Sequence, residues 1–167
     1  MKVVILCGGR GSRLRSANDK LPKPLAIVKG KPLIWHIINI YRKHGYKEFI
    51  LPLGYGGEYI KEYFYNYEWK NSDFIIDAAN ATVKLLKAPE DWKITLVDTG
   101  IDTMTGGRIK KIEPYITEDS FMLTYGDGLC DINITSLVNR HHKMGRIATV
   151  TGIKRNNPYG LMLINDG

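Results

Sequence analysis

Short apolar runs alternate with segments of helical periodicity along this chain, and that alternation restricts it to an α/β fold. Residues 3–6 form a continuous, branched apolar run, typical of a strand covered on both faces. Residues 33–41 place apolar side chains at helical spacing after Pro32, with Gly45 as the helix stop, and residues 49–51 follow as a second strand. Strands separated by helix-length segments form right-handed βαβ units. We therefore predict a Rossmann-like sheet, mixed but mainly parallel, flanked by helices.

The same patterns predict the remaining elements. They are a helix around residues 59–67, strands at 74–76, 83–86, 94–97, 121–125, 148–151 and 161–164, and a helix at 137–144 that Gly145 ends. No repeat, low-complexity tract or linker divides the chain, so we predict a single domain over residues 1–167. Because the chain stops just past a predicted strand and at a turn signal, we expect a sheet that is incomplete at its C-terminal end.

Composition excludes several classes of protein. No apolar run approaches the length that spans a bilayer, and the run at the amino terminus stops at Gly8, too early for a signal peptide. The two cysteines, Cys7 and Cys130, do not have the spacing of a zinc site. They could form a disulfide, but two small buried thiols are what a cytoplasmic protein usually has. We expect a cytoplasmic protein without a membrane partner.

The chain carries a net positive charge, and its basic residues are dispersed along the sequence. The net charge is +7, from 24 Lys and Arg against 17 Asp and Glu. Nucleic-acid binding would require the basic residues in one stripe with interleaved aromatics, so we predict no nucleic-acid partner. One local cluster near the amino terminus suits a small polyanion such as a triphosphate, and it consists of Arg10, Arg13, Arg15, Lys20 and Lys23.

A glycine-rich turn directly follows the first predicted strand. Residues 6–14 read Leu-Cys-Gly-Gly-Arg-Gly-Ser-Arg-Leu. Three glycines let the backbone approach phosphate oxygens, Ser12 adds a hydroxyl donor, and Arg13 adds a forked cation suited to phosphate. A Walker A loop would end in Gly-Lys-Ser or Gly-Lys-Thr, and a dinucleotide-binding loop would have glycine in place of Leu14. The turn is therefore either a phosphate-binding loop of another kind or a plain strand-to-helix turn.

Two further motifs present charged side chains. Lys23 lies between Pro22 and Pro24, which stiffen the backbone and hold the lysine outside a helix, so it can reach a phosphate at modest entropic cost. Asp127 lies between two glycines at the carboxyl end of a predicted strand, where doubly wound sheets present their ligands. Taken alone, the first motif favours a surface lysine in a proline turn, and the second is also typical of an Asp-Gly turn.

Together these motifs resemble a known family. The Gly-Gly-x-Gly-Ser-Arg-Leu turn followed by Pro-Lys-Pro resembles the signature of the sugar-1-phosphate nucleotidyltransferases. From residue 2 to about residue 163 the chain is similar to their glucose-1-phosphate cytidylyltransferase branch. The segments that carry this similarity are 33–37, 54–57, 60–64, 95–100, 104–108 and 124–128, of which 95–100 and 104–108 discriminate best. The resemblance implies the fold of the nucleotide-diphospho-sugar transferases.

The resemblance also implies an activity and a set of site residues. CTP and glucose 1-phosphate would give CDP-glucose and pyrophosphate, with Mg²⁺ as cofactor and Asp127 as its ligand. Arg13, Lys23 and Asp127 would be catalytic. The nucleotide would be held by Leu6, Cys7, Gly8, Gly9, Gly11, Ser12, Arg13, Lys23, Thr103, Arg108 and Asp127. For Thr103 and Arg108 the alternative is a capped turn with a solvated arginine.

The family resemblance extends beyond the site. It implies a homo-oligomer and a role in making surface-polysaccharide deoxysugars. Family members continue past the length of this chain, with a further lysine for the sugar phosphate and a second metal-binding aspartate. In the implied reaction a phosphate oxygen of the sugar 1-phosphate displaces pyrophosphate at the α-phosphorus. That oxygen is already ionised at neutral pH, so no general base is needed.

The sequence is compatible with three alternative functions. The same chemistry could use another nucleotide or another acceptor phosphate. The chain could be a nucleotide-binding or regulatory module without catalysis. Nucleic-acid binding rests on the net charge alone, and strong salt-sensitive binding to random oligonucleotides would support it.

Overall fold

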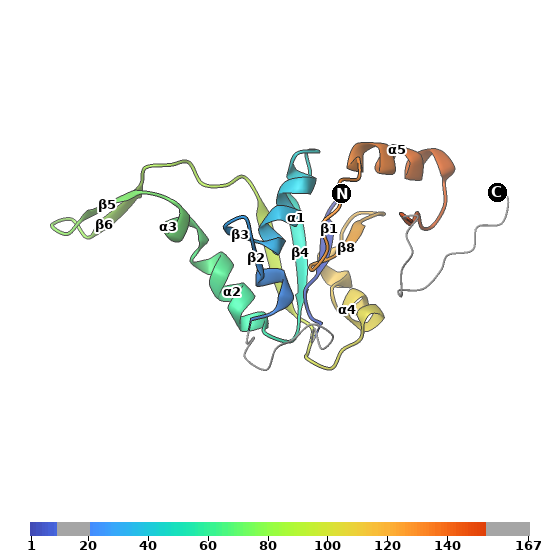
Figure 1. Cartoon of the computed structure of the whole chain (residues 1–167), viewed down its shortest axis with the longest axis horizontal. Helices are drawn as coiled ribbons and strands as arrows, with labels where there is room; N and C mark the ends of the chain where they lie inside the picture. The colour runs from blue at the N-terminus through green and yellow to red at the C-terminus, as the bar shows by residue number, and fades with distance from the viewer. Residues whose placement is uncertain (10–20, 153–167) are drawn as a thin grey trace. The chain divides into compact units, whose positions relative to one another are not determined.

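Four parallel strands form the main sheet in the computed structural model of the chain (Figure 1). They are β1 (Val3–Leu6), β4 (Glu48–Leu53), β7 (Lys93–Asp98) and β8 (Met122–Tyr125), in the order β7-β4-β1-β8. The structure describes residues 1–9 and 21–152. It divides into two compact units, residues 1–131 and 132–167, and all four strands belong to the first.

The order of the strands creates a switch point between β1 and β8. The chain proceeds outward from β1 through β4 to β7, and then returns to the other side of β1 as β8. β1 and β8 are in register from Val3 opposite Met122 to Leu6 opposite Tyr125, so both strands end at the same level. In open α/β sheets, ligands bind beyond the carboxyl ends of the strands at such a point.

The two central strands supply most of the core. Every residue of β1 is buried, and β4 is buried from its second residue onward. Val4, Ile50 and Val97 lie on one face of the sheet, where Ile112 packs against them. Ile112 follows α4 (Thr105–Lys111), so this helix is attached to the sheet at its C-terminal end. These continuous apolar strands are typical of a parallel sheet that is covered on both faces.

The helix α1 (Leu33–Arg42) begins and ends as its sequence predicts. Pro32 precedes its first residue, and Gly45 beyond its end adopts φ +88°, a left-handed conformation that favours glycine. The helix buries residues of one stripe at helical spacing, which are Ile34, Ile37, Ile38 and Tyr41. This stripe makes α1 an amphipathic covering helix.

Smaller elements complete the described part. They are the 3₁₀ turns η1 (Lys23–Leu25) and η2 (Glu113–Tyr115), the antiparallel pairs β2 (Ile27–Val28) with β3 (Lys31–Pro32) and β5 (Phe74–Asp77) with β6 (Thr82–Leu85), and the helices α2 (Gly57–Tyr65), α3 (Tyr67–Asn71) and α5 (Ile134–Met144). The β5–β6 hairpin lies apart from the main sheet (Figure 1). No helix of the described residues is long and apolar enough to cross a membrane.

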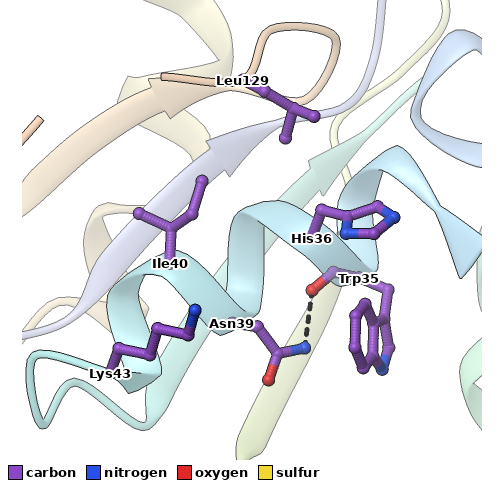
Figure 2. Close-up of a pocket in the computed structure, with 6 residues that line it drawn as sticks. All are labelled: Trp35, His36, Asn39, Ile40, Lys43 and Leu129. Carbon is purple, nitrogen blue, oxygen red and sulfur yellow. Dashed lines mark hydrogen bonds between the residues drawn. The ribbon is translucent and has the colours of Figure 1, made fainter. Parts of the chain in front are cut away.

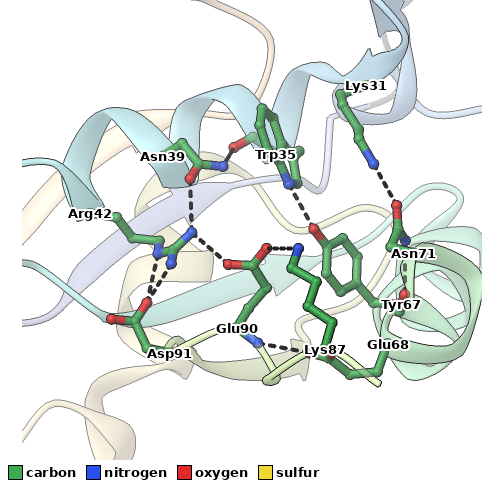
Figure 3. Close-up of polar contacts among 10 residues, drawn as sticks. All are labelled: Lys31, Trp35, Asn39, Arg42, Tyr67, Glu68, Asn71, Lys87, Glu90 and Asp91. Atoms are coloured by element: carbon green, nitrogen blue, oxygen red, sulfur yellow. Dashed lines mark hydrogen bonds and ion pairs between the residues drawn. The ribbon is translucent and has the colours of Figure 1, made fainter. Parts of the chain in front are cut away.

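A network of ion pairs and hydrogen bonds connects α1 to Glu90 and Asp91, in the segment before β7 (Figure 3). The Arg42 guanidinium on α1 lies 2.9 Å from Glu90 and 2.5 Å from Asp91. The Lys47 ammonium lies 2.7 Å from the other oxygen of Asp91. Trp35, also on α1, donates a hydrogen bond to the hydroxyl of Tyr67 at 2.8 Å. This network connects α1 and α3 to the chain entering β7.

The predicted fold class is confirmed, with corrections to single elements. The strands expected at 3–6, 49–51, 94–97 and 121–125 are the four strands of the main sheet. The helix expected around 59–67 is interrupted at Asn66, so that α2 and α3 are separate.

Two strand predictions near the end of the chain have different outcomes. The prediction of a strand at 148–151 is wrong, because the structure has no strand there. A strand needs a hydrogen-bonded neighbour, and no described residue pairs with this segment. The strand expected at 161–164 lies outside the described residues, and the single domain over 1–167 stays a prediction.

The two cysteines have different environments. Both are free thiols; Cys7 is buried at the end of β1, whereas Cys130 is exposed in the segment after β8. The expectation of two buried thiols is therefore wrong for Cys130. It lies beyond the end of a strand, where its side chain is not covered by a neighbouring element.

Candidate nucleotide site

The ends of β1 and β8 meet the proline-flanked segment at one place. Gly126, after β8, donates its N–H to the carbonyl of Leu6 at 3.0 Å. A Cβ at Gly126 would lie 2.9 Å from Cys7 Sγ and 3.0 Å from Pro24 Cγ. Only glycine allows this close approach. The first residues of the glycine turn, Leu6 and Cys7, therefore lie beside the Pro-Lys-Pro segment and the residues that follow β8.

Lys23 and Asp127 form an ion pair at this point. Lys23 is the first residue of η1, and Pro22 before it has an extended backbone conformation. The Lys23 Nζ lies 3.5 Å from Asp127 Oδ2. The two side chains are 30% and 44% exposed, so both are accessible to a ligand. An exposed pair of this kind contributes about 0–1 kcal/mol to stability. Its significance is therefore the placement of a cation and a carboxylate at the switch point.

Cys7 contributes to the site through its main chain. Burial raises the pKa of its thiol well above the ordinary value, and the nearby Asp127 charge raises it further. A thiol with such a pKa stays protonated at neutral pH and is not a nucleophile. Its N–H donates to the carbonyl of Pro52 on β4 at 3.2 Å, which holds the chain as it leaves β1.

Arg108 lies under the glycine turn and is only 5% exposed. Its guanidinium donates to the carbonyl of Gly8 at 2.9 Å and to the carbonyl of Leu53 at 2.8 Å. It also donates to the hydroxyl of Thr99 at 2.6 Å and to the carbonyl of Ile101 at 3.3 Å. The alternative of a solvated arginine is therefore wrong. The α4 helix turns the side chain inward, where the carbonyls at the ends of β1, β4 and β7 satisfy it.

Thr103 and Lys111 close the turn after β7. The hydroxyl of Thr103 donates to the carbonyl of Thr99 at 2.5 Å and accepts from Lys111 Nζ at 3.2 Å. Lys111 also donates to the carbonyl of Thr99 at 2.9 Å. The nucleotide contact of Thr103 stays a prediction. The contacts that Thr103 makes in the structure are those of a capped turn. Neither Thr99 nor Lys111 was predicted as a site residue from the sequence. Thr99 does lie in the discriminating segment 95–100.

Part of the predicted site lies outside the described residues. Gly11, Ser12 and Arg13 belong to it, as does Arg10 of the basic cluster. Gly9, the last described residue of the turn, is exposed. The structure therefore brings together Leu6, Cys7, Gly8, Lys23, Arg108 and Asp127 at the carboxyl edge of the sheet.

Asp127 fits a magnesium ligand. In the described part of the chain, no group of three or more His, Cys, Asp or Glu side chains could hold a metal by itself. Mg²⁺ commonly takes one or two protein carboxylates and completes its shell with water and substrate phosphates. The half-exposed Asp127 carboxylate can supply one such protein ligand.

Two pockets of the described surface lie away from this edge. One, of about 290 Å³, is centred on the exposed side of α1 (Figure 2) and is lined by Trp35, His36, Asn39, Ile40, Lys43 and Leu129. The other, of about 340 Å³, is lined by Lys61, Phe64, Tyr65, Trp92, Ile94 and Leu96. In the first pocket, Asn39 donates to the carbonyl of Trp35 and His36 donates to the carbonyl of Val28, both at 2.8 Å. Neither pocket contains a predicted site residue.

The fold and the site define an α/β protein with a lysine and an aspartate paired at the switch point of a parallel sheet. The chain belongs to the nucleotidyl transferase family, which it matches over residues 2–167.

Individual relatives agree with this family. A Bacillus subtilis (strain 168) protein named probable glucose-1-phosphate cytidylyltransferase is 50% identical over 167 residues, which is 100% of this chain and 66% of that protein. Glucose-1-phosphate cytidylyltransferase of Salmonella typhimurium is 42% identical over 169 residues, with the same coverage. The chain therefore spans about two thirds of the length of these relatives.

Solved structures share the fold over about half their length. The crystal structure of HddC from Yersinia pseudotuberculosis superimposes with a TM-score of 0.62 at 26% identity, covering 84% of this chain and 53% of that one. UDP-glucose pyrophosphorylase from Acinetobacter baumannii superimposes with a TM-score of 0.63 at 18% identity, covering 86% and 53%, which supports the fold alone.

Proposed function

We propose that this chain carries the nucleotide-binding part of an enzyme that transfers a cytidylyl group from CTP to glucose 1-phosphate. The observation that supports the proposal most directly is the Lys23–Asp127 ion pair beside the glycine turn, at the switch point of the sheet. Similarity to glucose-1-phosphate cytidylyltransferases over the whole chain supports the choice of nucleotide and acceptor.

The proposed site works by charge neutralisation and positioning. The Lys23 ammonium, presented by a stiff proline-flanked backbone, binds triphosphate oxygens with little entropy to lose. The main-chain N–H groups of the glycine turn, with Ser12 and Arg13, bind the same phosphates. Thr103 and Arg108 complete the nucleotide pocket on the β7 side. Since two anionic substrates must be brought together, electrostatic stabilisation supplies most of the rate enhancement.

The reaction proposed is a direct displacement. A phosphate oxygen of glucose 1-phosphate bonds to the α-phosphorus of CTP, the bond from that phosphorus to the bridging oxygen breaks, and pyrophosphate leaves with the electron pair. Asp127 would hold Mg²⁺, which when bound neutralises charge on the phosphate oxygens. Lys23 stabilises the charge that accumulates on the leaving pyrophosphate.

The test is formation of CDP-glucose from CTP, glucose 1-phosphate and Mg²⁺, detected by mass spectrometry. We expect Lys23→Ala and Asp127→Ala each to lower turnover by about 100-fold or more. The loss should occur without unfolding, because an exposed ion pair contributes at most about 1 kcal/mol to stability. Lys110→Ala and Glu113→Ala, which remove an exposed ion pair outside the proposed site, are matched controls. Near-normal pyrophosphate release from either site variant would contradict the assignment.

A related transfer with another nucleotide is the second candidate. HddC from Yersinia pseudotuberculosis has been crystallised in a complex with GMP-PN, and it is 28% identical to this chain with a TM-score of 0.57. Assays with all four nucleoside triphosphates, each with several sugar 1-phosphates, separate the candidates. CTP binding by calorimetry without any product would instead favour a nucleotide-binding module.

We also propose that the chain self-associates. Apolar side chains of the β5–β6 region are exposed and would be covered in an oligomer; they include Phe74, Ile75, Ile76, Val83 and Leu86. Sedimentation velocity over a range of protein concentrations tests this. A monomer at all concentrations would contradict it.

A further inference from the structure

The hydroxyl of Thr103 is held between a carbonyl and an ammonium beyond the carboxyl end of β7. It donates to the carbonyl of Thr99 at 2.5 Å and accepts from Lys111 Nζ at 3.2 Å. We propose that Lys111 is a positioning residue that fixes this hydroxyl as a hydrogen-bond acceptor, so that the site selects a pyrimidine with an amino group over one with a carbonyl group. This inference rests on the proposed function, because it assumes that the chain binds a nucleoside triphosphate.

The chemistry of the two partners determines where the hydroxyl hydrogen lies. A carbonyl oxygen can only accept, so the hydrogen of Thr103 Oγ1 points toward Thr99. An ammonium can only donate, so Lys111 occupies one of the two lone pairs of that oxygen. With respect to the described residues, the hydroxyl therefore has one lone pair left and no hydrogen to give.

Lys111 keeps the hydroxyl in this orientation because it joins the two oxygens. Its ammonium donates to Thr103 Oγ1 and also to the carbonyl of Thr99, at 2.9 Å. If the hydroxyl turned its hydrogen toward a ligand, two oxygens 2.5 Å apart would face each other with no hydrogen between them. Separating these oxygens would break the contacts of the ammonium. The lysine thus opposes any arrangement in which Thr103 donates to a ligand.

Gly100 keeps the hydroxyl accessible. A Cβ at Gly100 would lie 3.2 Å from Thr103 Oγ1 and 3.6 Å from Lys111 Nζ, so a side chain at this position would crowd the hydroxyl. The φ of +88° at Gly100 also favours glycine. Thr103 itself is only half-buried. The remaining lone pair can therefore be reached by a ligand at the carboxyl edge of the sheet.

The turn that contains Thr103 lies where the base of a bound nucleotide can reach. β1, β4 and β7 are consecutive in the sheet, so two spacings of about 4.8 Å separate the end of β7 from that of β1. One guanidinium, that of Arg108, contacts both places, since it donates to the carbonyl of Gly8 and to the hydroxyl of Thr99. A nucleotide with its phosphates on the glycine turn can therefore place its base against the turn after β7.

Cytosine and uracil differ in the group that they would present to this acceptor. Cytosine has an amino group at position 4, which donates, whereas uracil has a carbonyl oxygen there, which only accepts. The amino group can bond to Thr103 Oγ1, but the carbonyl oxygen would meet a lone pair and stay unpaired. A site built to bond one group of a substrate rejects an analogue that lacks it. We expect the chain to bind CTP about tenfold or more tightly than UTP.

The first experiment is a nucleotide series on the full chain with Mg²⁺, in which calorimetry gives the dissociation constants. It compares CTP, UTP and pyrimidin-2-one riboside triphosphate, which has only a hydrogen at position 4. We expect both analogues to bind more weakly than CTP, and UTP to bind most weakly, because it also places two acceptors against each other. Equal affinities for CTP and UTP, or tighter binding of UTP, would overturn the inference.

Substitutions of Thr103 show whether its hydroxyl reads the base. In Thr103→Val the carbonyl of Thr99 keeps its hydrogen bond from Lys111, so the turn should persist. We expect Thr103→Val to lower the ratio of CTP affinity to UTP affinity about tenfold, and Thr103→Ser, which retains the hydroxyl, to keep the parent ratio. An equal loss for CTP and UTP would place the hydroxyl against the ribose or the phosphates and would contradict the inference.

Lys111→Met tests the positioning residue itself. Without the ammonium, the hydroxyl can turn away from Thr99 and donate to uracil, so the ratio of CTP affinity to UTP affinity should fall about threefold to tenfold. The ratio is the informative quantity, since the loss of a positive charge affects both triphosphates alike. Lys110→Met, on the same helix, removes an ammonium that pairs with Glu113 at 2.6 Å and should leave the ratio unchanged.

The outcomes separate this inference from the proposed function. An unchanged ratio in Lys111→Met, in a protein whose thermal unfolding matches that of the parent, would contradict positioning by the lysine. A parent chain that binds no nucleotide would contradict the proposed function and the inference with it. A parent chain that binds CTP and UTP equally well would contradict this inference alone.

Discussion

At the residue scale, the candidate site depends on side chains that are far apart in the sequence and on glycines that permit them to meet. Lys23 and Asp127 are adjacent only because β1 and β8 are neighbours in the sheet. Gly126 allows the contact, since a Cβ at this position would lie within 3.0 Å of Leu6, Cys7 and Pro24. The Asp-Gly motif was predicted as a ligand position, but nothing in the sequence indicated how tightly Gly126 is packed.

We therefore expect Gly126→Ala to be destabilising by about 1–3 kcal/mol, because the added methyl group overpacks a full site. Gly128→Ala is the matched control, since a Cβ at Gly128 would meet no atom within 4 Å. Urea unfolding of the two variants and the parent protein gives the comparison. Equal stability of Gly126→Ala and Gly128→Ala would show that the ends of β1 and β8 are not in close contact.

At the scale of elements, local sequence patterns gave reliable positions for buried strands and less reliable ones elsewhere. β1, α1 and β4 were predicted because their apolar residues have the right period and their ends carry proline or glycine signals. The break between α2 and α3 has no such signal. The strand expected at 148–151 has the right composition but no hydrogen-bonding partner among the described residues.

Because of the ion pairs of Asp91, the stability of the fold should depend on pH in the acid range. The Lys47 ammonium, and then the Arg42 guanidinium, lower the pKa of the Asp91 carboxyl from its ordinary value of 3.8 to about 2. A carboxylate whose pKa is lower in the folded state stabilises the fold above its unfolded pKa, and that contribution disappears as the pH falls through the folded pKa.

We expect the parent protein to melt at a higher temperature than Asp91→Asn above about pH 4, with the difference shrinking as the pH falls toward 2. Thermal unfolding of both proteins between pH 7 and pH 2 measures it. Asp102→Asn serves as a second aspartate substitution outside this network. A difference that stayed constant across the range would contradict the assignment of the low pKa to this ion pair.

At the scale of the whole molecule, the described site residues all belong to one compact unit. β1, β4, β7 and β8, with the residues at their carboxyl ends, lie within residues 1–131. The second unit, residues 132–167, contains α5 and none of the predicted nucleotide contacts. CTP binding should therefore be a property of the first unit.

We expect a chain ending at Asp131 to bind CTP with a dissociation constant within about threefold of the value for the full chain, less than 1 kcal/mol of difference. Circular dichroism checks that the shortened chain keeps its α/β fold, and calorimetry measures the affinity. A folded but non-binding shortened chain would show that residues 132–167 contribute to the nucleotide site.

The α/β class, the glycine turn after the first strand, the proline-flanked lysine and the aspartate at a strand end could all be predicted from the sequence. These features are local, because they follow from side-chain periodicity and from the backbone preferences of glycine and proline. The contact of Lys23 with Asp127 and the burial of Arg108 beside Gly8 became visible in the folded chain alone. Those contacts depend on the order of the strands, and the hydrogen-bonding pattern that sets this order joins residues about 45 to 120 positions apart. No local pattern contains that information.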